Sequence, residues 1–265
     1  MNAPSSPVVN DVWQGLRRHT AARIALGRAG GSLPTGEVLA FAAAHAAARD
    51  AVHEAVDWDR LEADVRALPC DVVRIESAAP DRATYLQRPD LGRTLSDTSR
   101  QTLLTSKPTT APDLAIIVSD GLSAPAAQRQ AAPLLRELLP MLRASGLTLS
   151  PVFLVRLGRV AIEDEIGQAI GVKAAVILLG ERPGLGSPDS LGAYLVFGPK
   201  PGRTDAERNC VSNIRAGGLA FPAAAATLHY LITQSIQRRL SGVALKDERG
   251  DSLSAEAPRS PRLSS

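Results

Sequence analysis

A short apolar run that ends in a glycine-rich turn is the feature that most constrains the fold of this chain. Residues 174–179 read AAVILL, and residues 180–186 (GERPGLG) come directly after them. An apolar run of this length, bounded by glycine and proline and rich in β-branched residues, is typical of a buried strand in a parallel sheet. The turn then lies at the carboxyl end of that strand, where open α/β sheets bind their ligands. Two other loops, 158–160 and 205–210, are expected to converge on the same crevice.

Strand-like and helix-like segments alternate through the second half of the chain. The expected strands cover residues 114–118, 149–155, 174–179 and 193–197, and the expected helices cover 124–143, 162–170 and 222–240. This alternation with short links predicts an α/β fold, with a Rossmann-like, mostly parallel sheet and helices on both faces.

The region before the sheet is expected to be a mainly helical amino-terminal extension. Helices are expected from about residue 12 and over 37–56, 59–68 and 95–104, with a short strand at 72–75 and an irregular stretch at 85–93. The Pro/Ser-rich start and the Ser/Pro/charged end have compositions typical of disorder. The sequence therefore predicts a disordered leader (1–10), a mainly helical region (11–112), a sheet domain (113–246) and a disordered tail (247–265).

Composition excludes several classes of function. The 265 residues carry a formal net charge of +3 with only 3% aromatic residues, and the basic residues form no dense block. Base-stacking platforms are therefore not expected, and neither is nucleic-acid binding. The sequence contains no apolar run of the roughly 20 residues that span a bilayer, and its amino terminus does not resemble a secretory signal. A cytoplasmic location with reduced Cys70 and Cys210 is the default expectation.

The candidate chemical groups each have a structural alternative. The glycines of residues 180–186 permit close approach to an anion or a polar ligand, but the turn can equally be a tight strand exit in which Glu181 pairs with Arg182. The residues after the turn lead to another strand and not to a helix, which disfavours a dinucleotide fingerprint. The turn at residues 119–123 is more typical of a cap, with Ser123 capping the helix that begins at residue 124.

No catalytic or metal-binding set emerges from the remaining reactive residues. The four histidines lie on helices or near their ends without metal-ligand spacing, which favours packing or surface roles (His19, His45, His53 and His229). Cys210 has three interpretations: a thiol activated by nearby arginines, a thiol that packs against a ligand, or a buried structural cysteine, which is the commonest fate.

Taken together, several motifs in one order resemble the small (light) subunits of ethanolamine ammonia-lyase, an adenosylcobalamin-dependent enzyme. The resemblance covers most of the chain except the two tails. Its motifs are ARIALGRAGG (22–31), YLQRPDLGR (85–93), SDGLSA (119–124), GRV (158–160), DEIG (164–167), GERPGL (180–185), SL (190–191), NCVSNIR (209–215) and LSGV (240–243).

The resemblance implies a function and a site. It implies conversion of ethanolamine to acetaldehyde and ammonia through radicals, in a hetero-oligomer whose large subunit binds substrate and carries catalysis. This chain would cover the cobalamin, with Val160, Glu181 and Cys210 as cofactor contacts and no catalytic residue or metal ligand of its own. The helical region 11–112 would contact the large subunit. The chain lacks an Asp-x-His-x-x-Gly arrangement, in keeping with the base-on cobalamin binding of this family.

Two alternatives to this assignment stay open from the sequence. The chain could be a stand-alone α/β nucleotide- or cofactor-binding module that works without a partner. It could also have a structural or targeting role, since some members of the family reside in bacterial microcompartments.

Overall fold

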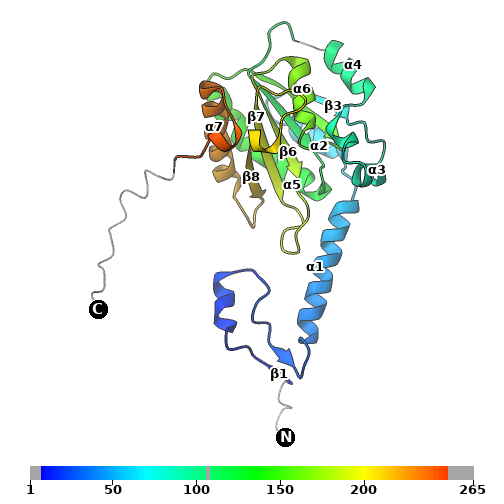
Figure 1. Ribbon diagram of the computed structural model, residues 1–265, viewed down its shortest axis with the longest axis vertical. Coiled ribbons are helices and arrows are strands. Elements are labelled where there is room, and N and C mark those ends of the chain that lie inside the picture. The colour runs from blue at the N-terminus through cyan, green and yellow to red at the C-terminus, as the bar shows by residue number, and fades with distance from the viewer. Residues whose placement is uncertain (1–6, 106–107, 250–265) are drawn as a thin grey trace, which may run out of the picture.

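The computed structural model describes residues 7–105 and 108–249, which form a six-stranded sheet covered by helices (Figure 1). The strands lie in the order β3-β5-β4-β6-β7-β8. Their bounds are Val72–Glu76 (β3), Leu114–Ser119 (β4), Leu149–Arg156 (β5), Ala174–Gly180 (β6), Leu191–Phe197 (β7) and Arg208–Ile214 (β8). The pairs β3·β5, β5·β4 and β4·β6 are parallel, whereas β6·β7 and β7·β8 are antiparallel. The expected α/β class and mostly parallel sheet are thereby confirmed.

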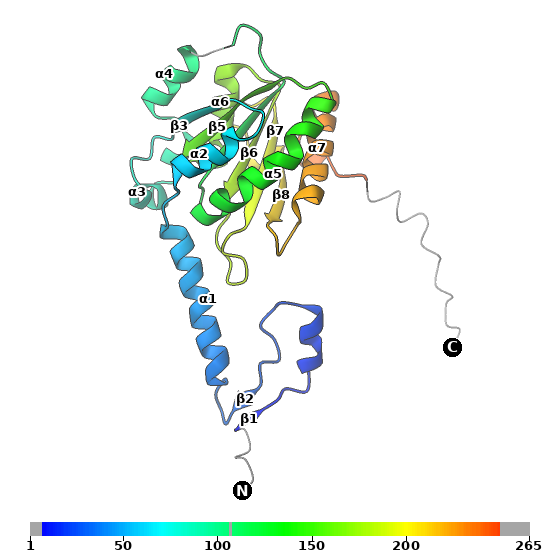
Figure 2. The same ribbon diagram turned by 180° about the vertical axis from the view of Figure 1, so that it is seen from behind.

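Two helical layers give the sheet two apolar cores (Figures 1 and 2). The larger core lies under three helices, Trp58–Arg66 (α2), Ala124–Ala144 (α5) and Phe221–Arg238 (α7). The opposite face packs against Asp97–Thr105 (α4) and Ile162–Ile170 (α6). Every residue of β4 and β6 is buried, as central strands covered on both faces require. This burial explains why these two strands read as unbroken apolar runs.

The amino-terminal part differs from the expectation in several places. Residues Gln14–His19 form a 3-10 helix (η1) and not an α-helix, and the Asp11 carboxylate accepts a hydrogen bond from the Trp13 N–H at 2.8 Å. Val8–Val9 (β1) and Arg28–Ala29 (β2) form a small antiparallel sheet, whereas this third of the chain was expected to have none. The short strand expected at 72–75 is β3, which joins the main sheet as an edge strand.

The stretch expected to be irregular contains two short helices. Arg82–Gln87 (α3) begins after Asp81, whose carboxylate accepts a hydrogen bond from the Thr84 N–H at 2.8 Å, and Leu91–Arg93 (η2) follows. Two more 3-10 turns lie later in the chain, Asp205–Glu207 (η3) and Gly242–Ala244 (η4).

Helix α1 (Thr35–His53) is mostly exposed and extends away from the sheet (Figures 1 and 2). Ala51, near its carboxyl end, is buried. The segment that carries β1 and η1 lies near the far end of the helix, and Arg23 of this segment reaches the Leu185 carbonyl at 3.4 Å.

The tail expected from residue 247 lies mostly outside the described residues. Its described start is attached to α7, because the Arg249 Nη2 donates to Thr227 Oγ1 at 2.7 Å and its guanidinium lies over the Tyr230 ring.

Candidate functional site

A cleft of about 830 Å³ opens at the carboxyl ends of β5 and β6 and extends beside α6. Its walls come from segments far apart in the sequence: α3 and η2, the turns after β4, β5 and β6, strand β7, and the connection between β7 and β8. The lining residues are Tyr85, Arg93, Leu122, Arg159, Val160, Ala161, Leu179, Gly180, Glu181, Arg182, Tyr194, Arg203, Thr204 and Asp205. The sequence placed a crevice at this sheet edge, and the cleft lies there.

Two of the three residues expected to contact a cofactor line this cleft. Val160 follows β5 and is half-buried, and Glu181 follows β6. The Glu181 carboxylate accepts hydrogen bonds from the Ser190 hydroxyl at 2.5 Å and from the Asn213 N–H at 3.3 Å. In the described residues Glu181 forms no ion pair with Arg182, so the turn is not a strand exit closed by that pair. Glu181 is thereby positioned by two neutral donors.

Cys210 lies beside the cleft on β8, directly opposite Tyr194 of β7. The sequence placed it in a loop, but residues 208–214 form a strand. Cys210 is exposed, so the interpretation of Cys210 as a buried structural cysteine is wrong. Desolvation raises the pKa of its thiol, with Tyr194 as a hydrogen-bonding neighbour that partly opposes the shift. A raised pKa disfavours a reactive thiolate and leaves a thiol placed for packing next to Tyr194.

The turn after β4 has a structural role, because Ser123 caps helix α5 as predicted. Ser123 Oγ accepts a hydrogen bond from the Ala126 N–H at 3.3 Å. The buried Asp120 carboxylate accepts the Leu157 N–H at 2.7 Å and forms an ion pair with Arg82 at 3.3 Å. These contacts fix the turns after β4 and β5 against each other, and so hold the floor of the cleft.

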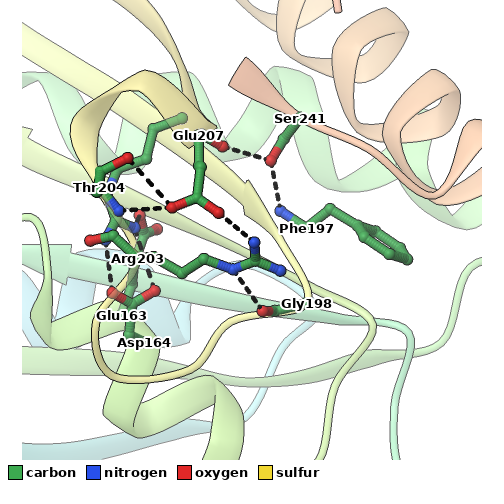
Figure 3. Close-up of polar contacts among 9 residues, drawn as sticks. Glu163, Asp164, Phe197, Gly198, Arg203, Thr204, Glu207 and Ser241 are labelled. Atoms are coloured by element: carbon green, nitrogen blue, oxygen red, sulfur yellow. Dashed lines mark hydrogen bonds and ion pairs between the residues drawn. The ribbon is translucent and has the colours of Figure 1, made fainter. Parts of the chain in front are cut away.

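The loop at residues 198–207, which forms one wall of the cleft, is held by several hydrogen bonds and an ion pair (Figure 3). The Glu207 carboxylate accepts from the Thr204 N–H at 2.8 Å and from its hydroxyl at 3.1 Å, and it also pairs with Arg203. These contacts lower the pKa of Glu207 to about 2, with the Thr204 backbone hydrogen bond as the largest cause. Arg203 Nε donates to the Gly198 carbonyl at 3.1 Å, and Ser241 Oγ donates to the Glu207 carbonyl at 2.5 Å. The loop is therefore held by hydrogen bonds and an ion pair within the chain.

A buried ion cluster beneath this loop joins α6 to β8. Arg208 Nη1 lies 2.6 Å from Glu163 Oε1, and Nη2 lies 2.5 Å from Asp164 Oδ2. The three side chains are at most 2% exposed. Burial raises the pKa of Glu163 well above its ordinary value and also raises that of Asp164, against the opposing effect of Arg208. The cluster fixes the start of α6, next to Val160, relative to the strand that carries Cys210.

Several lining residues were not singled out from the sequence. Tyr85, Arg93 and Tyr194 reach the cleft from α3, η2 and β7. Residues 85–93 were expected only to be irregular, and their polar composition did not by itself indicate a ligand wall. Nothing local in the sequence shows that Tyr194 of β7 lies opposite Cys210.

Within the described residues, the cleft holds no pair suited to acid–base or nucleophilic chemistry. Its ionisable lining consists of tyrosines, arginines and two carboxylates, without histidine or cysteine. In the described part of the chain no cluster of histidine, cysteine and acidic residues is arranged to hold a metal ion. Among the same residues no helix is both long and apolar enough to span a bilayer. The arrangement can bind and orient a large polar ligand.

Fold and cleft together define an α/β protein with a polar cleft at the carboxyl edge of its sheet. The family model for the ethanolamine ammonia-lyase light chain (EutC) matches residues 10–246. The chain therefore belongs to the ethanolamine ammonia-lyase light chain family, which confirms the resemblance seen in its motifs.

Similar proteins named ethanolamine ammonia-lyase small subunit occur in several bacteria. The one from Azotobacter vinelandii is 54% identical over 245 residues, covering 92% of this chain and 91% of the relative. That from Pseudomonas syringae pv. tomato is 52% identical, covering 93% and 85%. That from Xanthomonas campestris pv. campestris is 49% identical over 270 residues and covers 98% of both chains.

Proposed function

We propose that this chain binds and covers adenosylcobalamin in an ethanolamine ammonia-lyase, which converts ethanolamine to acetaldehyde and ammonia by a radical mechanism. The large subunit carries substrate binding and catalysis. The observation that supports this proposal is the cleft itself: Val160 and Glu181 line it and Cys210 lies beside it, without a nucleophile–base pair among the described lining residues.

The residues of the cleft fit one side of a cobalamin. A corrin ring offers an apolar face and a rim of amide side chains, which need acceptors and donors. Glu181 is a charged acceptor, Arg159 and Arg182 are donors, and Val160 and Leu122 supply apolar contact. A cleft of about 830 Å³ is within the range of ordinary ligand sites and holds only part of so large a cofactor. The other part is left for a partner subunit.

The protein contributes position and shielding at this site. When bound, the cofactor supplies a cobalt–carbon bond whose homolysis begins the radical reaction. Glu181 accepts amide or hydroxyl donors at the rim, Val160 covers apolar surface, and Cys210 packs its thiol against the ligand together with Tyr194. The braced loop at 198–207 keeps this wall in one geometry, which reduces the ordering cost of binding.

The amino-terminal part carries the proposed contact with the large subunit. In the described residues all the exposed large apolar side chains except Leu104 and Val243 lie between Val8 and Phe41. Val12 is 92% exposed and Trp13 is 64% exposed. A concentration of this kind marks a protein interaction surface. We assign it to the large subunit in a hetero-oligomer. The later part of the helical region 11–112, with α2, β3 and α4, packs into the sheet of the Rossmann-like cofactor-covering domain at 113–246.

Replacing Glu181 with alanine is expected to weaken cobalamin binding about tenfold to a hundredfold. A hydrogen bond to a charged group contributes about 1.5–3 kcal/mol, which corresponds to that range of affinity. The measurement is equilibrium binding of cyanocobalamin to the complex reconstituted with the large subunit. Glu137→Ala, an exposed change on α5, is the control. Equal affinities for wild type and Glu181→Ala would remove Glu181 from the contact set.

A further inference from the structure

Four arginines line the cleft, and most of them have no acidic partner among the described residues. Arg203 pairs with Glu207. Arg93, Arg159 and Arg182 form no ion pair with any residue that the structure describes. Three guanidinium groups without a described acidic partner in one cleft give its lining a positive potential, which favours a negatively charged ligand group.

Arg159 is held in place by contacts that leave part of its guanidinium free. Its Cζ lies 4.2 Å from the centre of the Tyr85 ring, and Nη2 donates to the Tyr85 carbonyl at 2.9 Å. The buried Nε has no acceptor, and Nη1 donates to no described residue. Tyr85 is itself fully buried, with its hydroxyl donating to the Gly158 carbonyl at 3.1 Å. Arg159 therefore lies fixed at the cleft wall with unused donors.

Gly92 allows this arrangement, and the residue after it is a second arginine of the cleft lining. The Gly92 carbonyl accepts the Arg159 N–H at 2.7 Å, and a Cβ at Gly92 would lie 2.6 Å from Arg159 Cγ. The Arg159 side chain passes directly over this glycine. Arg93, the next residue in η2, is exposed and also lines the cleft. The two arginines thus come from backbone segments that are hydrogen-bonded to each other, and both line the cleft.

Neither carboxylate of the cleft lining, Glu181 or Asp205, forms an ion pair with Arg159 or Arg93 among the described residues. Glu181 is held by Ser190 and Asn213, on the β7–β8 side. Asp205 is exposed in the loop after β7. Arg159 and Arg93 come from other segments, the β5–α6 turn and η2.

We propose that Arg159 and Arg93 form a subsite for a phosphate-type oxyanion. The planar guanidinium, presenting several donors, suits the oxygens of a phosphate group, and fixing it on an aromatic ring reduces the entropy lost on binding. The inference rests on the proposed function, in which the anion is the phosphodiester in the nucleotide loop of the bound cobalamin. Free phosphate has the same chemistry and is the competing source.

The test compares two corrinoids on the complex of this chain with the large subunit. Cyanocobalamin carries the phosphodiester, whereas dicyanocobinamide lacks it. In Arg159→Gln the affinity for cyanocobalamin is expected to fall about tenfold to a hundredfold, as for a lost hydrogen bond to a charged group. Its affinity for dicyanocobinamide is expected to stay within about threefold of wild type. Arg238→Gln, an exposed change on α7, is the control and should leave both affinities unchanged.

A second variant keeps the proposal testable if Arg159→Gln fails to fold. Arg93 is exposed, so Arg93→Gln leaves the fold intact, and it is expected to weaken cyanocobalamin binding several-fold with no effect on dicyanocobinamide. Equal weakening of both corrinoids, or no change in either, overturns the subsite while leaving the cofactor assignment in place. A wild-type complex that binds neither corrinoid overturns the proposed function and the subsite with it.

Inorganic phosphate separates the two sources of the anion. Titrated by calorimetry into the cobalamin-free complex, phosphate is expected to compete with cyanocobalamin and not with dicyanocobinamide. Saturable phosphate binding that depends on Arg159, with identical cyanocobalamin affinities for wild type and Arg159→Gln, would assign the subsite to free phosphate and overturn the proposal.

Discussion

Replacing Arg208 with methionine is expected to lower the free energy of unfolding by about 3–5 kcal/mol, the usual cost of removing one partner from a buried ion pair. Arg208 faces both Glu163 and Asp164, and all three side chains are at most 2% exposed. The variant would leave two buried carboxylates without their cation. Chemical denaturation monitored by circular dichroism measures the loss.

Two comparisons make this test specific. Arg88→Met removes an exposed pair whose side chains are 60% and 57% exposed, and should change stability by less than about 0.5 kcal/mol. The pH dependence also has a defined sign. Burial raises the pKa values of Glu163 and Asp164, and both pKa values rise further when Arg208 is removed. At a pH above the ordinary pKa values of 4.5 and 3.8, the folded variant therefore keeps protons on these carboxyl groups that the unfolded chain releases. The loss of stability should therefore be smaller at about pH 5 than at about pH 8. A loss under about 1 kcal/mol, or one that does not change with pH, would contradict a structural role for the cluster.

Replacing Gly180 with alanine is expected to destabilise the chain by about 1–3 kcal/mol and to reshape the cleft. A Cβ at this position would lie 2.1 Å from the Ser123 carbonyl oxygen and 2.3 Å from that of Asp120. Both atoms belong to the backbone, so the turn after β4 must shift. Because Leu122 of this turn lines the cleft, cobalamin affinity should fall together with stability.

Gly186→Ala is the matched control for this prediction. Gly186 lies in the same connection, a Cβ added to it would have nothing within 4 Å, and its φ is not in the left-handed region. The variant should behave as wild type in thermal unfolding and in cobalamin binding. Equal behaviour of the two alanine variants would show that the close approach at Gly180 is not needed.

The central sheet could be predicted from the sequence because its strands are buried on both faces. Strands β4 and β6 are unbroken apolar runs, and helix α6 was expected at its observed bounds, 162–170. The antiparallel direction of β7 was not predicted, although the short connection between β6 and β7 indicates it. Only residues 181–190 separate β6 from β7, and a parallel crossover needs about a dozen residues or more.

Strand β8 could not be predicted from the pattern of apolar residues, because it is an edge strand stabilised by polar contacts. Its residues read RNCVSNI, and its first buried side chain is Arg208, which is satisfied by carboxylates 44 and 45 residues away in sequence. The same reason limits prediction of the site. The positions of Val160 and Glu181 follow from strand ends, whereas the wall built by Tyr85, Arg93 and Arg203 depends on tertiary packing.

Co-expression with the large subunit, followed by an assay of ethanolamine deamination with and without adenosylcobalamin, tests the central claim most directly. The expected result is activity that requires both chains and the cofactor, with neither chain active alone. Deamination by this chain alone, or a stable two-chain complex whose activity is unaffected by adenosylcobalamin, would contradict the assignment of this chain as the cofactor-covering subunit.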